Sequence, residues 1–354
     1  MDRKDRAKGA LMGALIGEAL GVGPHWFYDL KELRENYGEW ITDYTAPMKG
    51  RYHEGLEPGE LSQQGWIIQK MAEYLIDNDG YDDESFCRMM DETVIPYASG
   101  VPMDGKGGYT SQLMRDLYQT RVIDGKPWSE VEGIADTTES LERNIPTAIL
   151  YSKDLRSVCD HVASNTALTQ KDNVTGSLSV AFNLVLAMLI DGEPLDASIS
   201  PKLMKRVHSG ELPFYAVTSS DLGIPQGRSM SEKSKGLFAS PDALLSPGHM
   251  AQAASEDGID IEPAWKASIV YGMPCAIYHM LPTAYYLSAR FKDDFEQGVL
   301  HALNGGGQNQ VRAMLCGALI GAQVGFSGIP SRFIEGLKDC DNLVSLADAL
   351  ADKA

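Results

Sequence analysis

The pentapeptide Gly-Ala-Leu-Ile-Gly occurs twice in this sequence, at residues 13–17 and 317–321, near opposite ends of the chain. Each copy lies in a stripe of small residues spaced by four, namely Gly9, Gly13, Gly17 and Gly21 in the first and Ala313, Gly317, Gly321 and Gly325 in the second. This spacing places the small residues on one helix face. Each interior glycine costs about 0.5–1 kcal/mol relative to alanine, so close backbone packing must compensate. We therefore predict that two central helices, one from each end of the chain, pack on each other. A duplicated domain is the alternative, but no repeat with a period of about 20–50 residues accompanies the repeated pentapeptide.

The remaining apolar residues recur mostly at helical spacing, and long alternating runs typical of strands are missing. The expected fold class is all-α, a bundle of many helices with almost no strand. Residues 66–76 predict an amphipathic helix that Ser62 is placed to cap. Residues 177–190 are apolar nearly all round, which predicts a helix buried at the bundle centre. Further helices are expected at 110–120, at 262–290 in two or three pieces around Pro274 and Pro282, and at 293–303.

Two segments rich in glycine, proline and polar residues predict long loops, at 96–109 and at 219–250. Neither has the composition of a linker between domains, so we expect one domain over residues 1–354 with a long surface loop at about 219–250. Loops of this length often border a pocket or serve as an interaction surface.

The chain carries 31 basic and 49 acidic residues, a formal net charge of −18. This charge repels phosphate backbones and anionic membrane surfaces, and no basic patch offsets it, so neither nucleic acid nor a membrane is an expected partner. The five cysteines are an odd number without a CxxC pair, which is typical of a reduced compartment and indicates a cytoplasmic protein. Nothing in the pattern indicates an oligomeric state.

Three segments carry a family resemblance. They are KGALMGALIGEALGVGPHW at the N-terminus, GELSQQGWIIQKMAEYL after it and LNGGGQNQVRAMLCGALIGAQVGFSGIP near the C-terminus. They resemble the opening helix, the Thr-Asp-Asp-Thr helix start and the closing Gly-Gly-Asp-Thr-Asp-Thr motif of the ADP-ribosylglycohydrolases, in that order along the chain. The His-Trp-Phe-Tyr run at 25–28 is most similar to the branch with selenoprotein J and the J-type crystallins of cnidarian lenses. The resemblance implies the orthogonal multi-helix bundle of that family.

The resemblance also implies a site. In the family, carboxylates and threonine hydroxyls hold two magnesium ions that bind ribose hydroxyls and orient the water that cleaves the bond to ADP-ribose. The matching positions here are His25, Ser62, Gln63, Gln64, Gln308, Asn309 and Gln310. Five positions that carry a carboxylate in the family are therefore histidine or glutamine in this chain. Magnesium is bound through carboxylates, and paired cations need anionic ligands to offset their repulsion, so we expect no metal and no other cofactor.

Two interpretations of these seven positions stay open: either the amides bond only to one another, or they line a pocket that still binds a ligand. Arg312 follows the former ligand loop and would either contact a phosphate or, as we favour, lie exposed on its helix. His25 would act as an acid or base, or more often as a packed, hydrogen-bonded residue.

The sequence thus favours a non-catalytic member of the fold, with a crystallin-like structural role or a small polar or ADP-ribose-like ligand. The alternative is an active hydrolase of ADP-ribosyl bonds with one metal ion or none, which would need the retained carboxylates Glu18, Glu60 and Asp29. A third hypothesis is an interaction protein that works through the 219–250 loop.

Overall fold

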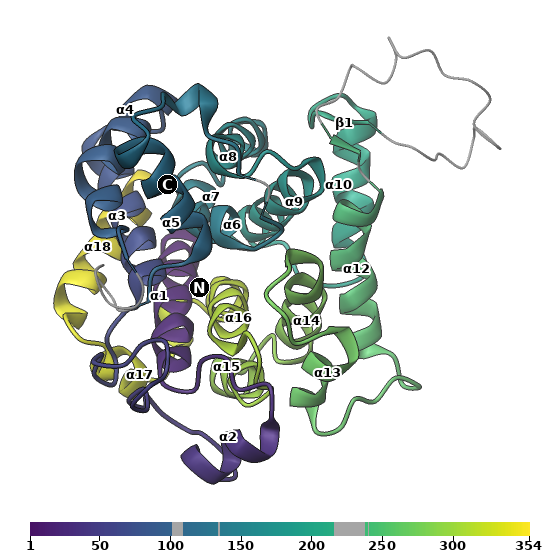
Figure 1. The fold of residues 1–354 in the computed structure, drawn as a ribbon. Coiled ribbons are helices and arrows are strands. Elements are labelled where there is room, and N and C mark those ends of the chain that lie inside the picture. The colour runs from purple at the N-terminus through teal and green to yellow at the C-terminus, as the bar shows by residue number, and fades with distance from the viewer. Residues whose placement is uncertain (101–108, 134, 216–237, 240) are drawn as a thin grey trace.

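The computed structural model describes residues 1–100, 109–133, 135–215, 238–239 and 241–354. These residues form a bundle of helices with a single two-residue pair of parallel strands among them (Figure 1). The helices of the N-terminal half are α1 (Arg3–Val22), α2 (Leu30–Tyr37), α3 (Gln63–Asp77), α4 (Asp83–Met89), α5 (Gln112–Tyr118), α6 (Glu139–Arg143), α7 (Ile145–Leu150), α8 (Leu155–Thr169) and α9 (Asn173–Ile190). Those of the C-terminal half are α10 (Ile199–His208), α12 (Pro241–Ser255), α13 (Ala267–Tyr271), α14 (Ile277–Arg290), α15 (Phe295–Leu303), α16 (Asn309–Val324), α17 (Ser331–Gly336) and α18 (Cys340–Lys353).

Shorter elements connect these helices. The strands are β1 (Phe214–Tyr215) and β2 (Phe238–Ala239). Single turns of 3-10 or π-helix are η1 (Met90–Val94), η2 (Ile95–Tyr97), η3 (Gln119–Ile123), η4 (Trp128–Glu130), η5 (Ala264–Lys266) and η6 (Phe326–Gly328). The prediction of an all-α fold is confirmed.

The two glycine-rich helices lie against each other at the centre of the bundle, as the sequence predicts (Figure 1). They run antiparallel, because Gly9 faces Gly321 and Gly13 faces Gly317. A Cβ atom on Gly13 would lie 2.8 Å from the carbonyl carbon of Gly317, where no real side chain fits. Gly325 ends α16 at φ 72°, so it terminates the stripe and does not extend it. The small residues thus allow backbone contact between chain segments 300 residues apart in sequence.

Helix α9 and helix α3 also follow their sequence patterns. Residues 177–190 form the C-terminal part of α9 and are buried except at Leu178. Helix α9 is long and apolar enough to cross a membrane, but 83% of it is buried inside the protein, as expected of a core helix. Helix α3 begins at Gln63, and the hydroxyl of Ser62 accepts a hydrogen bond from the Gln64 N–H at 3.2 Å, which confirms the predicted cap.

Three sequence expectations need correction or fall outside the described residues. Residues 241–250 belong to helix α12 and not to a loop, because their apolar residues pack on the core despite Pro247 inside the helix. Pro282 lies inside α14 and does not separate two helices. Residues 216–237, which include most of the predicted 219–250 loop, and residues 101–108 of the 96–109 loop lie outside the described part.

Candidate functional site

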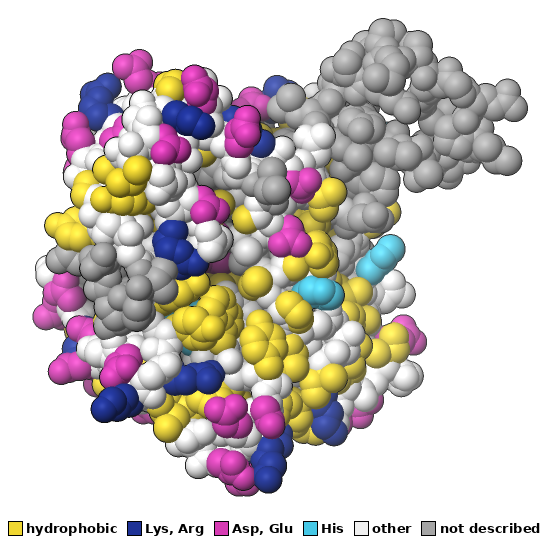
Figure 2. All heavy atoms as spheres, viewed as in Figure 1, with side chains coloured by type: hydrophobic (Ala, Val, Ile, Leu, Met, Phe, Trp, Pro, Cys, Tyr) yellow, Lys and Arg dark blue, Asp and Glu magenta, His cyan; other side chains and the backbone are white. Residues whose placement is uncertain are grey.

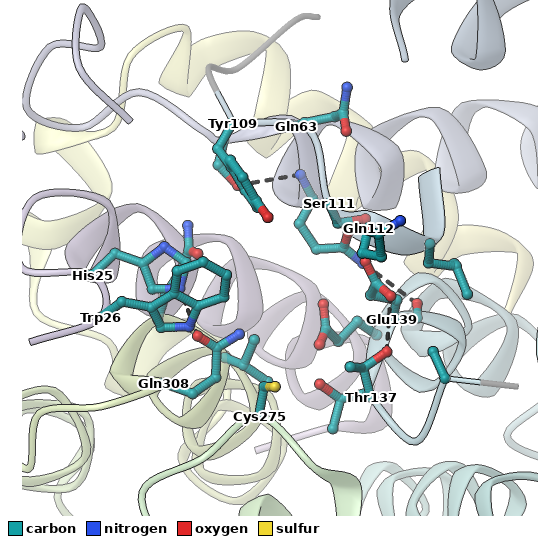
Figure 3. Close-up of a pocket in the computed structure, with 18 of the residues that line it drawn as sticks. His25, Trp26, Gln63, Tyr109, Ser111, Gln112, Thr137, Glu139, Cys275 and Gln308 are labelled. Carbon is teal, nitrogen blue, oxygen red and sulfur yellow. Dashed lines mark hydrogen bonds between the residues drawn. The ribbon is translucent and has the colours of Figure 1, made fainter. Parts of the chain in front are cut away.

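A cavity of about 170 Å³ lies between the N-terminal ends of α3, α6 and α16. Figure 3 shows His25 and Trp26 on one side of it and Glu139 and Thr137 on the other. Six of the seven positions predicted from the resemblance line it, namely His25, Ser62, Gln63, Gln64, Gln308 and Gln310. Segments near residues 25, 63 and 310 of the sequence therefore meet at one place.

His25 is held in a short chain of hydrogen bonds. Its Nε2 atom lies 2.5 Å from Oε1 of Gln308, and its Nδ1 atom lies 2.6 Å from Nε2 of His53. Because an amide oxygen only accepts, Nε2 of His25 carries the proton and Nδ1 accepts from His53. Burial, together with the neighbouring His53, lowers the pKa of His25 well below its usual value. His25 is thus a neutral, packed histidine, in keeping with the structural interpretation of this residue.

The backbone around Trp26 is fixed by strained geometry. Trp26 has φ 62°, a conformation that costs a residue with a side chain about 1 kcal/mol or more. Backbone hydrogen bonds join Trp26 and Phe27 to Gly307, and the Arg51 guanidinium donates to the carbonyl oxygen of Trp26 at 2.8 Å. These contacts set the indole at the pocket wall, where it packs edge-on against Tyr109.

Gln310 contacts a buried glutamate. Its Nε2 donates to Oε1 of Glu18 at 2.8 Å, and the Ser62 hydroxyl and backbone N–H donate to the same carboxyl group. Burial raises the pKa of Glu18 to about 7, while these hydrogen bonds lower it in part. Glu18, which the sequence retained as a possible catalytic carboxylate, is therefore used in a closed contact between α1, α3 and α16.

The two glutamines at the start of α3 are also hydrogen-bonded. The Gln63 amide donates to the carbonyl oxygen of Tyr97 at 3.2 Å and to the Thr110 hydroxyl at 3.3 Å. The Gln64 amide donates to the carbonyl oxygen of Glu139 at 3.4 Å. Each former ligand position on α3 therefore bonds to a neighbouring segment of the pocket wall.

Asn309 and Arg312 do not line the cavity. The Asn309 amide donates to the carbonyl oxygens of Pro24 and Leu303, and so ties the α16 start to its surroundings. Arg312 is fully buried, and its guanidinium donates to the carbonyl oxygens of Ala302 and Gly306. The expectation of an exposed Arg312 is wrong, because this side chain holds the turn between α15 and α16; nor does it reach the pocket to contact a phosphate.

The structure adds two glutamates that the sequence analysis missed. Glu139 and Glu142, both on α6, line the cavity. Glu142 is 1% exposed, and neither carboxyl oxygen has a hydrogen bond of normal geometry, although the Thr138 and Gln64 side chains lie beside it and lower its pKa in part. Burial, with the charges of Glu139 and Glu18, raises the pKa of Glu142 to about 8. The only sequence signal was a glutamate pair at a spacing of three, which is common on exposed helices.

The other retained carboxylates lie elsewhere. Asp29 caps α2 by accepting from the Lys31 N–H, and Glu60 accepts from the Glu57 N–H in a turn. Among the described residues, no group of three or more histidine, cysteine, aspartate or glutamate side chains is arranged to hold a metal ion.

Comparison with known proteins decides the family. The sequence matches the ADP-ribosylglycohydrolase family over residues 1–354. The chain belongs to the ADP-ribosylglycohydrolase family. A solved structure described as an ADP-ribosylglycohydrolase-related protein complex has the same fold, with a TM-score of 0.63, 19% identity and 99% coverage of both chains.

Relatives of this ADP-ribosylglycohydrolase-family chain include proteins with different descriptions. Crystallin J1A of Tripedalia cystophora is 24% identical over 98% of this chain and 97% of its own length. An uncharacterized protein of Archaeoglobus fulgidus is 24% identical over 98% of this chain and 96% of its own length. The resemblance to the crystallin-containing branch is thus confirmed along nearly the whole chain.

Proposed function

We propose that this member of the ADP-ribosylglycohydrolase family works without a metal pair, as a non-catalytic protein that binds a small polar ligand in the pocket. One observation carries the proposal. Gln310, at a position where the family resemblance implies a metal-binding carboxylate, donates its amide N–H to Glu18. A group that donates to a neighbouring carboxyl group cannot at the same time present negative charge to a cation.

The donor chemistry of the whole set supports the same conclusion. His25, Gln63, Gln64, Gln308 and Gln310 bring no negative charge, and all five already form hydrogen bonds within the protein. Two Mg²⁺ ions a few ångströms apart require carboxylates to offset their repulsion. The residues present therefore do not fit a pair of magnesium ions.

Two further facts agree with a non-catalytic role. Crystallin J1A, a relative at 24% identity, is named a crystallin, and a crystallin-like role here is part of the proposal. The net charge of −18 favours solubility at high concentration. The cavity of about 170 Å³ still has room for a small ligand.

A thermal unfolding series with Mg²⁺, ADP-ribose, or both tests the absence of a metal site. Because only a ligand that binds the folded state stabilises it, we expect no shift of the melting temperature with Mg²⁺ at millimolar concentration. The matched variant carries Gln63→Asp, Gln64→Asp, Gln308→Asp and Gln310→Asp. It should gain a magnesium-dependent shift and lose stability in chelator, because four carboxylates then repel one another. A shift of several degrees with Mg²⁺ in the parent protein would contradict the proposal.

Hydrolysis of ADP-ribosyl bonds without a metal pair is the second candidate function. The observation in its favour is that two glutamates missed by the sequence analysis, Glu139 and Glu142, line the pocket. Carboxyl groups with raised pKa values are suited to general acid catalysis. Release of ADP-ribose from a modified protein in the presence of chelator, lost on Glu142→Gln substitution, would support this candidate over the first.

A further inference from the structure

We propose that the ligand of the pocket is a linear aliphatic diamine, with one ammonium group beside Glu139 and Glu142 and the other in a neighbouring cavity. This inference rests on the proposed function, because it names the ligand class of the same pocket. It also excludes phosphate-bearing ligands from that pocket.

The charge of the pocket wall selects the class. Two glutamates line the cavity, and no lysine or arginine does so among the residues that the structure describes. Arg312, which the sequence analysis considered for a phosphate contact, is buried and donates to backbone carbonyl oxygens. A phosphate would meet the two carboxyl groups of the cavity wall, whereas an ammonium ion would meet opposite charge there.

Glu142 supplies the specific contact. Its two buried oxygens form no hydrogen bond of normal geometry, with only the Thr138 and Gln64 side chains beside them, and buried acceptors left in this way are rare in proteins because they cost free energy. A primary ammonium has three N–H donors and no acceptor. It would donate to Glu142 and lie beside Glu139, which already accepts from the Thr137 hydroxyl at 2.8 Å and from Ser111.

The charged groups around Glu142 allow it to lose a proton when an ammonium ion binds. The titratable groups that face it are Glu139 on the same helix, Glu18 on α1 and Cys275 before α14. Among the described residues, the cation beside Glu142 is Arg143, which is buried and donates to Asn165 and Thr169. With its pKa raised to about 8, Glu142 is protonated in the empty pocket at neutral pH, and an arriving ammonium ion replaces that proton.

The neighbouring cavity accounts for the second ammonium group. It has a volume of about 270 Å³ and shares Gln112, Leu113 and Ala135 with the first. Its wall carries two further carboxylates, Asp116 and Glu132, and again no described lysine or arginine.

The surface between the two cavities suits an alkyl chain. Leu113, Leu117 and Val131 line the second cavity, and an aliphatic chain laid along them removes apolar surface from water. In the first cavity Trp26 and Tyr109 present aromatic rings, which attract cations. Hydrophobic side chains also gather on this face of the protein, over the part where α14 and α16 lie (Figure 2).

The helix ends at the pocket do not reverse this preference. The N-terminus of a helix favours anions, and α3 begins at the cavity wall. The free N–H groups at the start of α3 already have an acceptor, because the Glu18 carboxyl accepts from the backbone N–H groups of Ser62 and Gly65. The carboxyl groups of α6 therefore determine the charge that the ligand meets.

Calorimetric titration of the full chain with three probes of equal length tests the proposal at about pH 7 in low salt. The probes are 1,6-diaminohexane, hexylamine and 1,6-hexanediol. We expect the diamine to bind about tenfold more tightly than the diol, with the monoamine between them. Glu142→Gln should weaken diamine binding about tenfold and leave the diol unchanged. Repeating the diamine titration in buffers of different ionisation enthalpy should detect a released proton.

One further variant and one control locate the second ammonium group. Asp116→Asn should reduce diamine affinity to that of hexylamine without changing hexylamine binding. Glu60→Gln, a carboxylate outside both cavities, should change neither. Equal binding of diol and diamine would overturn the inference but leave a metal-free ligand pocket intact. Failure of the diamine to bind would overturn it as well, and a magnesium-dependent thermal shift would in addition overturn the proposed function.

Discussion

The Gln310 amide on α16 donates to the Glu18 carboxyl on α1 at 2.8 Å, directly beside the place where the two helices touch. The contact depends on the glycine stripe, because a Cβ atom on Gly21 would lie 2.6 Å from Cβ of Gln310. The same small residues that allow the helices to pack thus bring a polar pair together at the pocket. Packing and site chemistry are therefore linked in this fold.

Replacement of Gln310 by aspartate tests that link. Gln310→Asp removes the N–H donor and places a second carboxyl group near the buried Glu18. We expect the free energy of unfolding at pH 7 to fall by about 2–4 kcal/mol, because a buried acceptor loses its donor and like charges repel. Urea unfolding followed by circular dichroism gives the value. The control, Gln297→Asp at an exposed position on α15, should change stability by less than about 0.5 kcal/mol; equal losses would show that the Glu18 contact is unimportant.

The glycine stripe makes a prediction of its own. Gly13→Ala places a methyl group against the Gly317 backbone, which can move only if α1 and α16 separate. We expect a loss of about 3 kcal/mol or more in unfolding free energy, since overpacking against backbone leaves no rotamer to relieve it. Gly258→Ala is the matched control, because a Cβ atom there meets nothing within 4 Å. Similar thermal midpoints for the two variants would contradict close packing at Gly13.

The helices and their central pair follow from the sequence because their signals are local. The spacing of Gly9, Gly13 and Gly17 needs only helical geometry, and Ser62 caps α3 by contacts two residues away. By contrast, α12 was missed because the composition around Pro247 favours a loop, and only packing on the core makes it helical.

The candidate site could be predicted in part for a similar reason. The resemblance gave the seven positions, and six of them meet at the cavity. Glu142 carried no signal of its own, because its importance comes from burial by segments far away in sequence. Arg312 was misplaced because an arginine on a helix is usually exposed, whereas here the carbonyl oxygens of Ala302 and Gly306 require a donor.

The histidine pair predicts a protonation state. Burial and His53 lower the pKa of His25 well below 6.5, so the folded protein keeps the ring neutral where the unfolded chain binds a proton. The stability that this group contributes is fully present above the pKa of the histidine in the unfolded chain. It is lost as the pH falls below about 6.5. Imidazole nitrogen NMR at pH 5.5 should find His25 neutral, with the proton on Nε2. A His25 signal that titrates near 6.5 would contradict the chain of hydrogen bonds through Gln308.

Glu142 predicts the opposite dependence on pH. Its pKa is raised to about 8 in the folded protein from 4.5 in the unfolded chain, so between these values the folded state holds a proton that the unfolded state has lost. Stability therefore falls as the pH rises through this range, by at most about 1.4 kcal/mol per pH unit from this group.

Glu142→Gln, which keeps the shape of the protonated acid, should remove that loss, so the variant should gain stability relative to the parent between pH 5 and pH 8. Urea unfolding of both proteins at the two pH values measures the difference, and Glu60→Gln, at a carboxylate outside the pocket, provides the control. A constant difference between Glu142→Gln and the parent at both pH values would mean that Glu142 is ionised in the folded protein throughout this range, which would contradict the prediction.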